Sequence, residues 1–269
     1  MIRTVSDLAN YSAQEIEEVR RSINIRGLYY MGAKQLGRGV GSTLAEYEAW
    51  QREPATEVCR TCHGTGVYKK PMRSVGTIHA SSAHMCVRKL YYDVDASMPP
   101  KSEIAPELQI TFAMGHGIHD VVQRALHAAL PDRFEDEVKV DLDEAMILGS
   151  STDGVIQLDQ ARVLLEIKSI GKEFDTLTKP KTEHITQAVG IYAKALQVPF
   201  ISFLYVSKSW PHNVKEFVVV YDEKVYTRWW KTKGSLVENA LETGSPPVAD
   251  ASKEECAGCG YAYFCPQKL

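Results

Sequence analysis

No apolar run in this sequence approaches the length of a membrane-spanning helix, and the segment Met1–Asp7 lacks the apolar core of a signal peptide. The phosphate-binding pattern G-x-x-x-x-G-K-[ST] is also missing, so no ATP-driven motor is indicated. A formal net charge of -3 shows no excess of either sign, although it is compatible with a locally basic cleft. We therefore expect a globular protein without membrane association.

Cysteine occurs only six times, and a reducing compartment such as the cytoplasm would favour metal binding or reactivity over disulfides. Three cysteines close the chain with the spacing C-x2-C-x5-C, and a fourth stands far upstream: Cys256, Cys259, Cys265 and Cys86. Four thiolates can hold an iron–sulfur cluster or a structural zinc ion. Four free, buried cysteines are the plain alternative, which the tail spacing disfavours.

The remaining two cysteines, Cys59 and Cys62, form a C-x-x-C pair followed by a G-x-G turn. Such a pair is half of a zinc site, and His63, His79 and His84 are the nearest residues that could complete it. The segment therefore predicts either a zinc knuckle or a metal-free loop.

Periodicity predicts helices separated by strands in a mixed order. Expected helices cover 12–25, 44–52, 103–130, 183–197 and 222–241, with a glycine-rich stretch from Gly32 to Gly41 after the first. Expected strands lie near 138–140, 146–149, 153–158, 162–168, 201–207 and 214–220. This order predicts a mixed α/β fold, with a central sheet flanked by helices. A boundary near residue 78 would divide an N-terminal helical and loop region, 1–77, from the main domain, 78–269.

Residues 153–168 are predicted to form a hairpin around a two-residue turn, Asp159-Gln160. Counting outward from that turn places Asp153 opposite Glu166. Because side chains on a strand alternate between faces, Glu166 and Lys168 share one face.

Two carboxylates at the separation of cross-strand neighbours, about 5 Å, repel each other unless a cation lies between them. Mg²⁺ or Mn²⁺ is the usual cation for such a pair, because both bind a few carboxylates together with waters and phosphate oxygens. The plain alternative is that Glu166 and Lys168 form the polar face of a half-exposed strand.

The run Gly-Ser-Ser-Thr-Asp-Gly-Val at 149–155, followed by Glu166-Ile167-Lys168, resembles the PD-(D/E)XK nuclease superfamily. More narrowly, it is similar to the RecB-type branch, which includes the CRISPR-associated Fe–S exonucleases and their phage relatives. The resemblance covers about residues 78–269 and implies a divalent-metal-dependent DNA nuclease, first of all an exonuclease acting on single-stranded ends. It also implies a setting in recombination, repair or replication, with proteins of those processes as partners, in a bacterial or phage-infected cytoplasm.

The resemblance assigns roles to particular side chains. A G-x-x-x-H motif on the upstream helix points to His119 as a metal ligand beside Asp153 and Glu166. Lys168 would assist the attacking water, and Gln187 would support it. The branch usually has Q-x-x-x-Y on the next helix, but here Tyr192 stands one residue further on. On an α-helix, residues five apart do not share a face, so core packing is the alternative for this tyrosine.

The same branch carries one cysteine before the nuclease core and three after it, which implies a [4Fe–4S] cluster on the four residues named above. Four further residues are cationic or aromatic candidates for contact with DNA: Arg88, Tyr92, Lys172 and Tyr192. Two other functions fit parts of the pattern. One is a non-catalytic nucleic-acid-binding or assembly module that retains the fold and cluster, and the other is a zinc-stabilised interaction protein.

Overall fold

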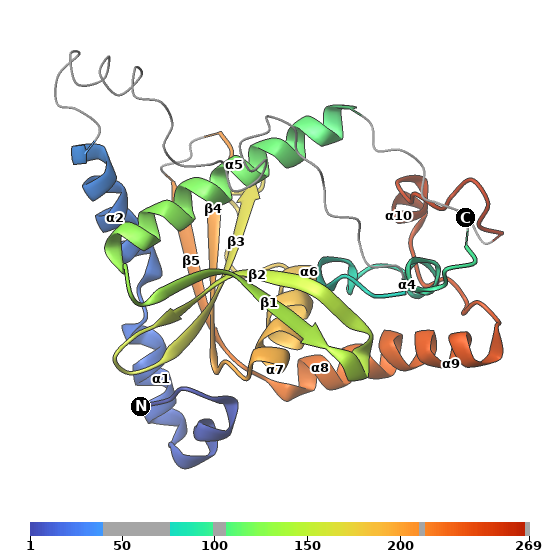
Figure 1. The fold of residues 1–269 in the computed structure, drawn as a ribbon, viewed down its shortest axis with the longest axis horizontal. Helices are drawn as coiled ribbons and strands as arrows, with labels where there is room; N and C mark the ends of the chain where they lie inside the picture. The colour runs from blue at the N-terminus through green and yellow to red at the C-terminus, as the bar shows by residue number, and fades with distance from the viewer. Residues whose placement is uncertain (40–75, 99–105, 210–212, 267–269) are drawn as a thin grey trace.

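The computed structural model describes residues 1–39, 76–98, 106–209 and 213–266. These residues form one five-stranded sheet with the order β1-β2-β3-β4-β5 (Figure 1). The strands are β1 (Phe134–Leu142), β2 (Ile147–Gln157), β3 (Arg162–Ile170), β4 (Phe200–Ser207) and β5 (Val214–Val220). Only the β3–β4 pair is parallel, so the sheet is mixed, as the sequence predicted.

Helices surround this sheet. The longer ones are α1 (Ala13–Ser22), α2 (Ile25–Gly39), α4 (Val87–Val94), α5 (Pro106–Ala129), α8 (Glu223–Trp229) and α9 (Ser235–Thr243). Shorter helical segments are η1 (Val5–Asn10), η2 (Ala80–Ser82), η3 (Asp143–Ala145), α6 (Thr182–Ile185), η4 (Thr186–Tyr192), α7 (Ala193–Leu196), η5 (Trp230–Gly234) and α10 (Lys253–Ala257). The segments η4 and η5 are π-helical, and each continues directly into its neighbouring helices.

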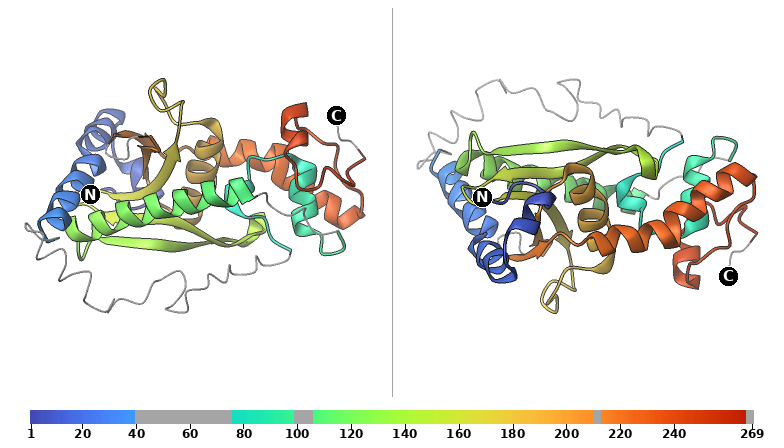
Figure 2. Two further views of the ribbon diagram at one scale, coloured as in Figure 1. Left: turned by 90° about the horizontal axis from the view of Figure 1, so that it is seen from above. Right: turned by 90° about the horizontal axis from the view of Figure 1, so that it is seen from below.

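The two faces of the sheet bury separate apolar clusters. On β3, Leu164 belongs to the cluster beneath α4, η4 and α9, whereas Leu165 and Ile167 belong to the cluster beneath α2 and α5. Both faces of β3 and β4 are therefore covered, which explains their nearly continuous apolar sequences. The N-terminal helices gather at one end of the molecule, and α4, α9 and α10 gather at the other (Figures 1 and 2).

The glycine-rich stretch after the first expected helix differs from the prediction, because residues up to Gly39 belong to α2. The reason lies in tertiary packing. A Cβ atom at Gly32 would stand 1.7 Å from the carbonyl oxygen of Ala125 on α5, so this glycine allows the two helices to approach closely. The carboxylate of Glu216 on β5 also accepts the backbone N–H groups of Ile25 and Arg26, which caps the start of α2.

Several predictions concern residues outside the described ranges. The helix expected at 44–52 and the Cys59/Cys62 pair both lie there. The boundary near residue 78 stays a prediction, although Ile2 and Ile25 share a core cluster with the sheet. Among the described helices, none combines the length and the apolar character needed to cross a bilayer.

The Gly32 contact can be tested by adding one methyl group. We expect Gly32→Ala to lower the free energy of unfolding by roughly 1–3 kcal/mol, because the methyl group overpacks the α2–α5 contact. Gly117→Ala on α5 is the matched control, since its Cβ would meet no atom within 4 Å. The control should leave stability unchanged or raise it by up to about 1 kcal/mol. Denaturant unfolding measures both variants, and equal stabilities would contradict the close contact.

Candidate active site

The hairpin of β2 and β3 forms with the predicted register. Its backbone pairs run from Gln157–Arg162 to Gly154–Leu165, and beyond the turn Leu158 N–H donates to the Ala161 carbonyl at 2.9 Å. The same count carried one step further places Asp153 across from Glu166.

At this position, hydrogen bonds that involve side chains replace the backbone hydrogen bonds between the two strands. Thr152 Oγ1 donates to the Leu165 carbonyl at 3.0 Å, and the backbone N–H of Ile167 donates to Asp153 Oδ2 at 2.6 Å. The backbone pairing of the two strands ends at Gly154–Leu165. The Asp153 carboxylate is therefore fixed between the two strands by a bond that belongs to its side chain.

Glu166 is the most deeply buried acidic group of this site, with 1% of its surface exposed. Its Oε1 lies 2.5 Å from Lys168 Nζ, while its Oε2 is buried without a hydrogen-bond partner. Burial raises the pKa of Glu166 to about 7, against the opposing charge of Lys168. Conversely, the two nearby carboxylates outweigh the burial of Lys168 and raise the pKa of its ammonium.

His119 reaches this pair from α5. Its Nδ1 lies 2.9 Å from Asp153 Oδ1. Burial disfavours charge on both groups, but their mutual attraction prevails, so the pKa of Asp153 is lowered and the pKa of His119 is raised. The less favoured neighbour, His116, is exposed.

Gln187 and Tyr192 complete the cluster through the π-helical segment η4. Lys168 Nζ donates to Gln187 Oε1 at 3.2 Å, and Gln187 Nε2 donates to the Tyr192 hydroxyl at 2.9 Å. Residues five apart face each other in a π-helix, because its bonds join i to i+5. The extra residue between Gln187 and Tyr192 is thus accommodated, and both side chains are buried on the same side as Lys168.

Two residues near this cluster were missed by sequence reasoning. Gln123 donates to the backbone carbonyl of Asp153 at 2.9 Å and to Glu137 Oε1 at 3.2 Å. Glu137 also accepts a bond from Ser151 Oγ at 2.8 Å, and it has a positive φ of 50°. The position of Gln123 could have been found, because it follows His119 by one helical turn and shares its face. Nothing local in the sequence signals the strained backbone of Glu137.

Within the described residues, no group of three or more His, Cys, Asp or Glu side chains is close enough to form a metal cluster. The hairpin residues nevertheless suit a divalent cation. Glu166 offers a buried, unpartnered oxygen, and Asp153 and His119 lie across from it. Oxygen donors with one imidazole match the preferences of Mn²⁺, and the oxygens alone match those of Mg²⁺.

The four cysteines of the predicted cluster line one cavity of about 270 Å³. Cys86 is the N-cap residue of α4, Cys256 lies on α10, and Cys259 and Cys265 follow in the tail. All four are partly buried free thiols. The fold therefore brings both ends of the predicted motif to one cavity, although Cys86 and Cys256 are 170 positions apart in the sequence.

Several of the contacts that hold the tail against α4 involve no cysteine sulfur. Asp250 accepts the backbone N–H of Val87 at 2.7 Å and the ammonium of Lys233 at 2.8 Å. The same ammonium donates to the Met85 carbonyl at 2.6 Å. Docking of the tail thus has a polar component of its own.

Two predicted DNA contacts belong to this docking surface instead. Arg88 is buried and donates to the Pro247 carbonyl at 2.6 Å. The buried ring of Tyr92 packs on Tyr261 and Phe264, with centroids 5.3 and 5.0 Å away. Their burial beneath the tail leaves no side-chain surface for direct contact with DNA.

The other two predicted contacts differ from each other. Tyr192 is buried within the cluster around Gln187, so it too has no face for a base. Lys172 is exposed directly after β3 and stays a candidate for phosphate contact.

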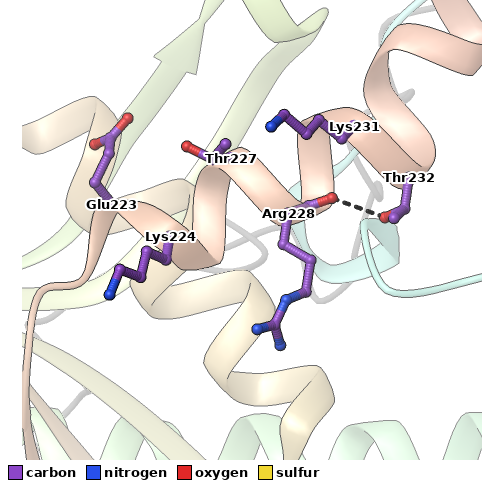
Figure 3. A pocket seen from close by; sticks show the side chains of 6 residues that line it. All are labelled: Glu223, Lys224, Thr227, Arg228, Lys231 and Thr232. Atoms are coloured by element: carbon purple, nitrogen blue, oxygen red, sulfur yellow. Dashed lines mark hydrogen bonds between the residues drawn. The ribbon is translucent and has the colours of Figure 1, made fainter.

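A larger cavity, of about 370 Å³, lies along α8 and η5 (Figure 3). Its lining residues are Glu223, Lys224, Thr227, Arg228, Lys231 and Thr232. None of the predicted site residues is among them. This cavity is a feature of the α8 surface and lies apart from the candidate active site.

No protein-family model matches this chain, and no curated protein matches it. Among solved structures, one similar chain is SSO0001, with 18% identity over 77% of this chain and 92% of that chain, and a TM-score of 0.46. A second similar structure is an alkaline exonuclease from Laribacter hongkongensis, LHK-Exo, with 16% identity and a TM-score of 0.48. The match covers 63% of this chain and 90% of that chain.

The complex of LHK-Exo with dAMP is similar to the same degree, with 17% identity, coverage of 63% and 90%, and a TM-score of 0.48. The structural neighbours thus include an alkaline exonuclease. At such low identities and TM-scores, this likeness assigns no activity and no residue role to the present chain. The PD-(D/E)XK resemblance and its Fe–S branch stay predictions, and the residue roles rest on the geometry described above.

One histidine near the cluster is held neutral. The Tyr205 hydroxyl accepts the backbone N–H of Lys181 at 3.1 Å and lies within hydrogen-bond distance, 2.7 Å, of His184 Nδ1. Burial, followed by the charge of Lys168, lowers the pKa of His184 to about 3.

We expect this histidine to make the fold sensitive to acid. Below the ordinary histidine pKa of about 6.5, His184 is protonated in the unfolded chain but stays neutral in the folded protein. The free energy of unfolding therefore falls as the pH drops from 7 towards 4. His184→Asn retains a polar atom near Nδ1 and should lose less stability over that range. Denaturant unfolding at pH 7 and pH 5 compares the two proteins, and parallel losses would contradict the assignment.

Proposed function

We propose that this protein is a divalent-metal-dependent DNA nuclease, most directly an exonuclease that hydrolyses single-stranded ends in recombination, repair or replication. One observation carries the proposal. At the open end of the β2–β3 hairpin, a buried carboxylate with an unpartnered oxygen lies beside a partly buried ammonium and across from a second carboxylate, which are Glu166, Lys168 and Asp153. This arrangement leaves one oxygen of Glu166 without a partner, at a position where a cation would bind.

Asp153, Glu166 and His119 would hold the cation, which supplies a Lewis acid and a water of lowered pKa when it is bound. Lys168 would lie next to the water and the scissile phosphate, where its ammonium offsets the charge that develops on the phosphate. Gln187 fixes that ammonium by accepting its hydrogen bond, and Tyr192 in turn fixes Gln187. The reaction is hydrolysis of a phosphodiester by water without a covalent intermediate.

The donor set favours a [4Fe–4S] cluster in the tail, because four thiols from two distant segments line one cavity, although in this structure they are not gathered closely enough to hold a metal ion. A structural zinc ion on the same thiols is the competing occupant. In either case the group would add a covalent closure to the hydrogen bonds of Asp250, Lys233 and Tyr261. The role assigned to it is structural.

The catalytic assignment predicts a separation of cleavage from binding. We expect Glu166→Ala and Lys168→Ala to reduce degradation of end-labelled single-stranded DNA with Mn²⁺ or Mg²⁺ by at least about 1,000-fold, because both change groups at the reacting phosphate. Binding of the same DNA should persist. Asp159→Ala is the matched control, since it removes an exposed carboxylate from the turn of the same hairpin.

Two results would contradict this assignment. Folded wild-type protein that binds DNA without degrading single- or double-stranded substrates would indicate a non-catalytic binding module. Loss of cleavage in Asp159→Ala equal to that in Glu166→Ala would show that any change to the hairpin abolishes activity. The length of the labelled products separates exonuclease from endonuclease action and gives the polarity.

The metal of the tail is tested by elemental analysis of protein purified without oxygen. We expect Cys259→Ser to lose iron and the brown absorption of the cluster, since the cavity then has three thiols. Cys62→Ser, outside the predicted set, should retain iron. Zinc in place of iron in the wild-type protein, lost in Cys259→Ser, would refute the iron–sulfur cluster. Loss of iron in both variants would refute the four-cysteine assignment.

A further inference from the structure

The N-terminal half of α5 exposes apolar side chains that no part of the described structure covers. Ile110, Phe112 and Met114 are 64%, 50% and 53% exposed. Ile110 and Met114 lie about 160° around the helix from Phe112, so Phe112 is the one exposed apolar side chain of the three on its own face of α5.

Phe112 lies on the same line of the helix as the active site. Residues seven apart on an α-helix point in nearly the same direction, so Phe112, His119 and Leu126 form one row. Leu126 is fully buried in the core, and His119 contacts Asp153. Phe112 extends the row beyond the sheet, about 10 Å along the axis from His119.

The helix surface between Phe112 and His119 is open. A Cβ atom at Gly115 would meet only Ser169 Oγ within 4 Å, at 3.6 Å, and His116 is exposed. A strand whose phosphate lies at His119 can bring a neighbouring base to the Phe112 ring along this face, where it would pass the exposed imidazole of His116.

We infer that Phe112 is a stacking platform for a base adjacent to the scissile phosphate, and that it selects single-stranded nucleic acid. This inference deepens the proposed nuclease function and rests on it for the position of the phosphate. An aromatic face accepts any base, because every base has a flat π-surface. In a duplex those surfaces are covered by neighbouring base pairs, so only an unpaired base can stack on the ring.

The test is the affinity of the full-length protein for a fluorescent single-stranded oligonucleotide, measured in the non-cleaving Glu166→Ala background. We expect Phe112→Ala and Phe112→Leu each to weaken binding about tenfold, and Phe112→Tyr to retain it, because tyrosine keeps the ring. Met114→Ala is the matched control, since Met114 is equally exposed but about 140° around the helix from His119. The control should bind like the parent.

A second measurement ties the ring to one base. Oligonucleotides with a single abasic site, placed at successive positions, should include one that weakens binding of the parent protein about tenfold. At that position Phe112→Ala should add no further loss, because the stacking partner is already missing. Duplex binding should be the same with and without the phenylalanine.

Three outcomes would overturn the inference: equal affinity of Phe112→Ala and its parent, equal loss in Met114→Ala, or a change of oligomeric state on substitution with unchanged affinity. The last result would assign the surface to a second copy of the chain. Failure of the proposed nuclease function appears separately, as absence of DNA cleavage by the wild type. Loss of stacking affinity in a protein that cannot cleave would leave the Phe112 assignment standing.

Discussion

Burial of the Glu166 carboxylate constrains everything around it. A charged group removed from water is costly unless opposite charge and hydrogen bonds replace the lost solvation. Lys168 satisfies one oxygen, and the other has no partner. Proteins retain such an arrangement where function requires it, and a cation bound at the free oxygen would supply the missing compensation. Burial, with a smaller contribution from Asp153, raises the pKa of Glu166 to about 7, which reflects the same cost of keeping this carboxylate charged.

The fold holds this carboxylate by two kinds of structure. The β2–β3 hairpin sets Asp153 across from Glu166 through short-range pairing. Elements distant in sequence supply the rest: α5 brings His119, and η4 brings Gln187 and Tyr192. The parallel pairing of β3 and β4 explains how Gln187 and Tyr192 reach the site, because the connection between two parallel strands must cross one face of the sheet. That crossover contains η4, directly above the face that carries Lys168.

Local features of the sequence predicted the hairpin well. Its turn contains two residues and its strands alternate, so counting outward from Asp159-Gln160 was enough to place the acidic pair. The mixed sheet followed from the order of helices and strands for the same reason. The π-helical segment could not be predicted, because the spacing of Gln187 and Tyr192 disagrees with an α-helix and no local signal marks a π-helix.

Other differences arise from contacts between distant segments. The glycines of α2 suggested a break in the helix, but Gly32 serves the close approach to α5. Arg88 and Tyr92 suggested a surface for DNA, but the tail covers both. The apolar side chain of Phe112 is compatible with core packing, but it is exposed at its turn of α5. In each case the residue type was compatible with two environments, and only the tertiary arrangement decides between them.

The central claim is that Glu166 and Asp153 share a divalent cation. The most direct measurement is a crystal structure of the protein soaked with Mn²⁺, with the metal located by its anomalous scattering. The account predicts a peak in coordination contact with Glu166 Oε2 and an oxygen of Asp153, with His119 beside it. Manganese bound elsewhere, with the Glu166–Lys168 ion pair unchanged and Oε2 still unpartnered, would contradict it.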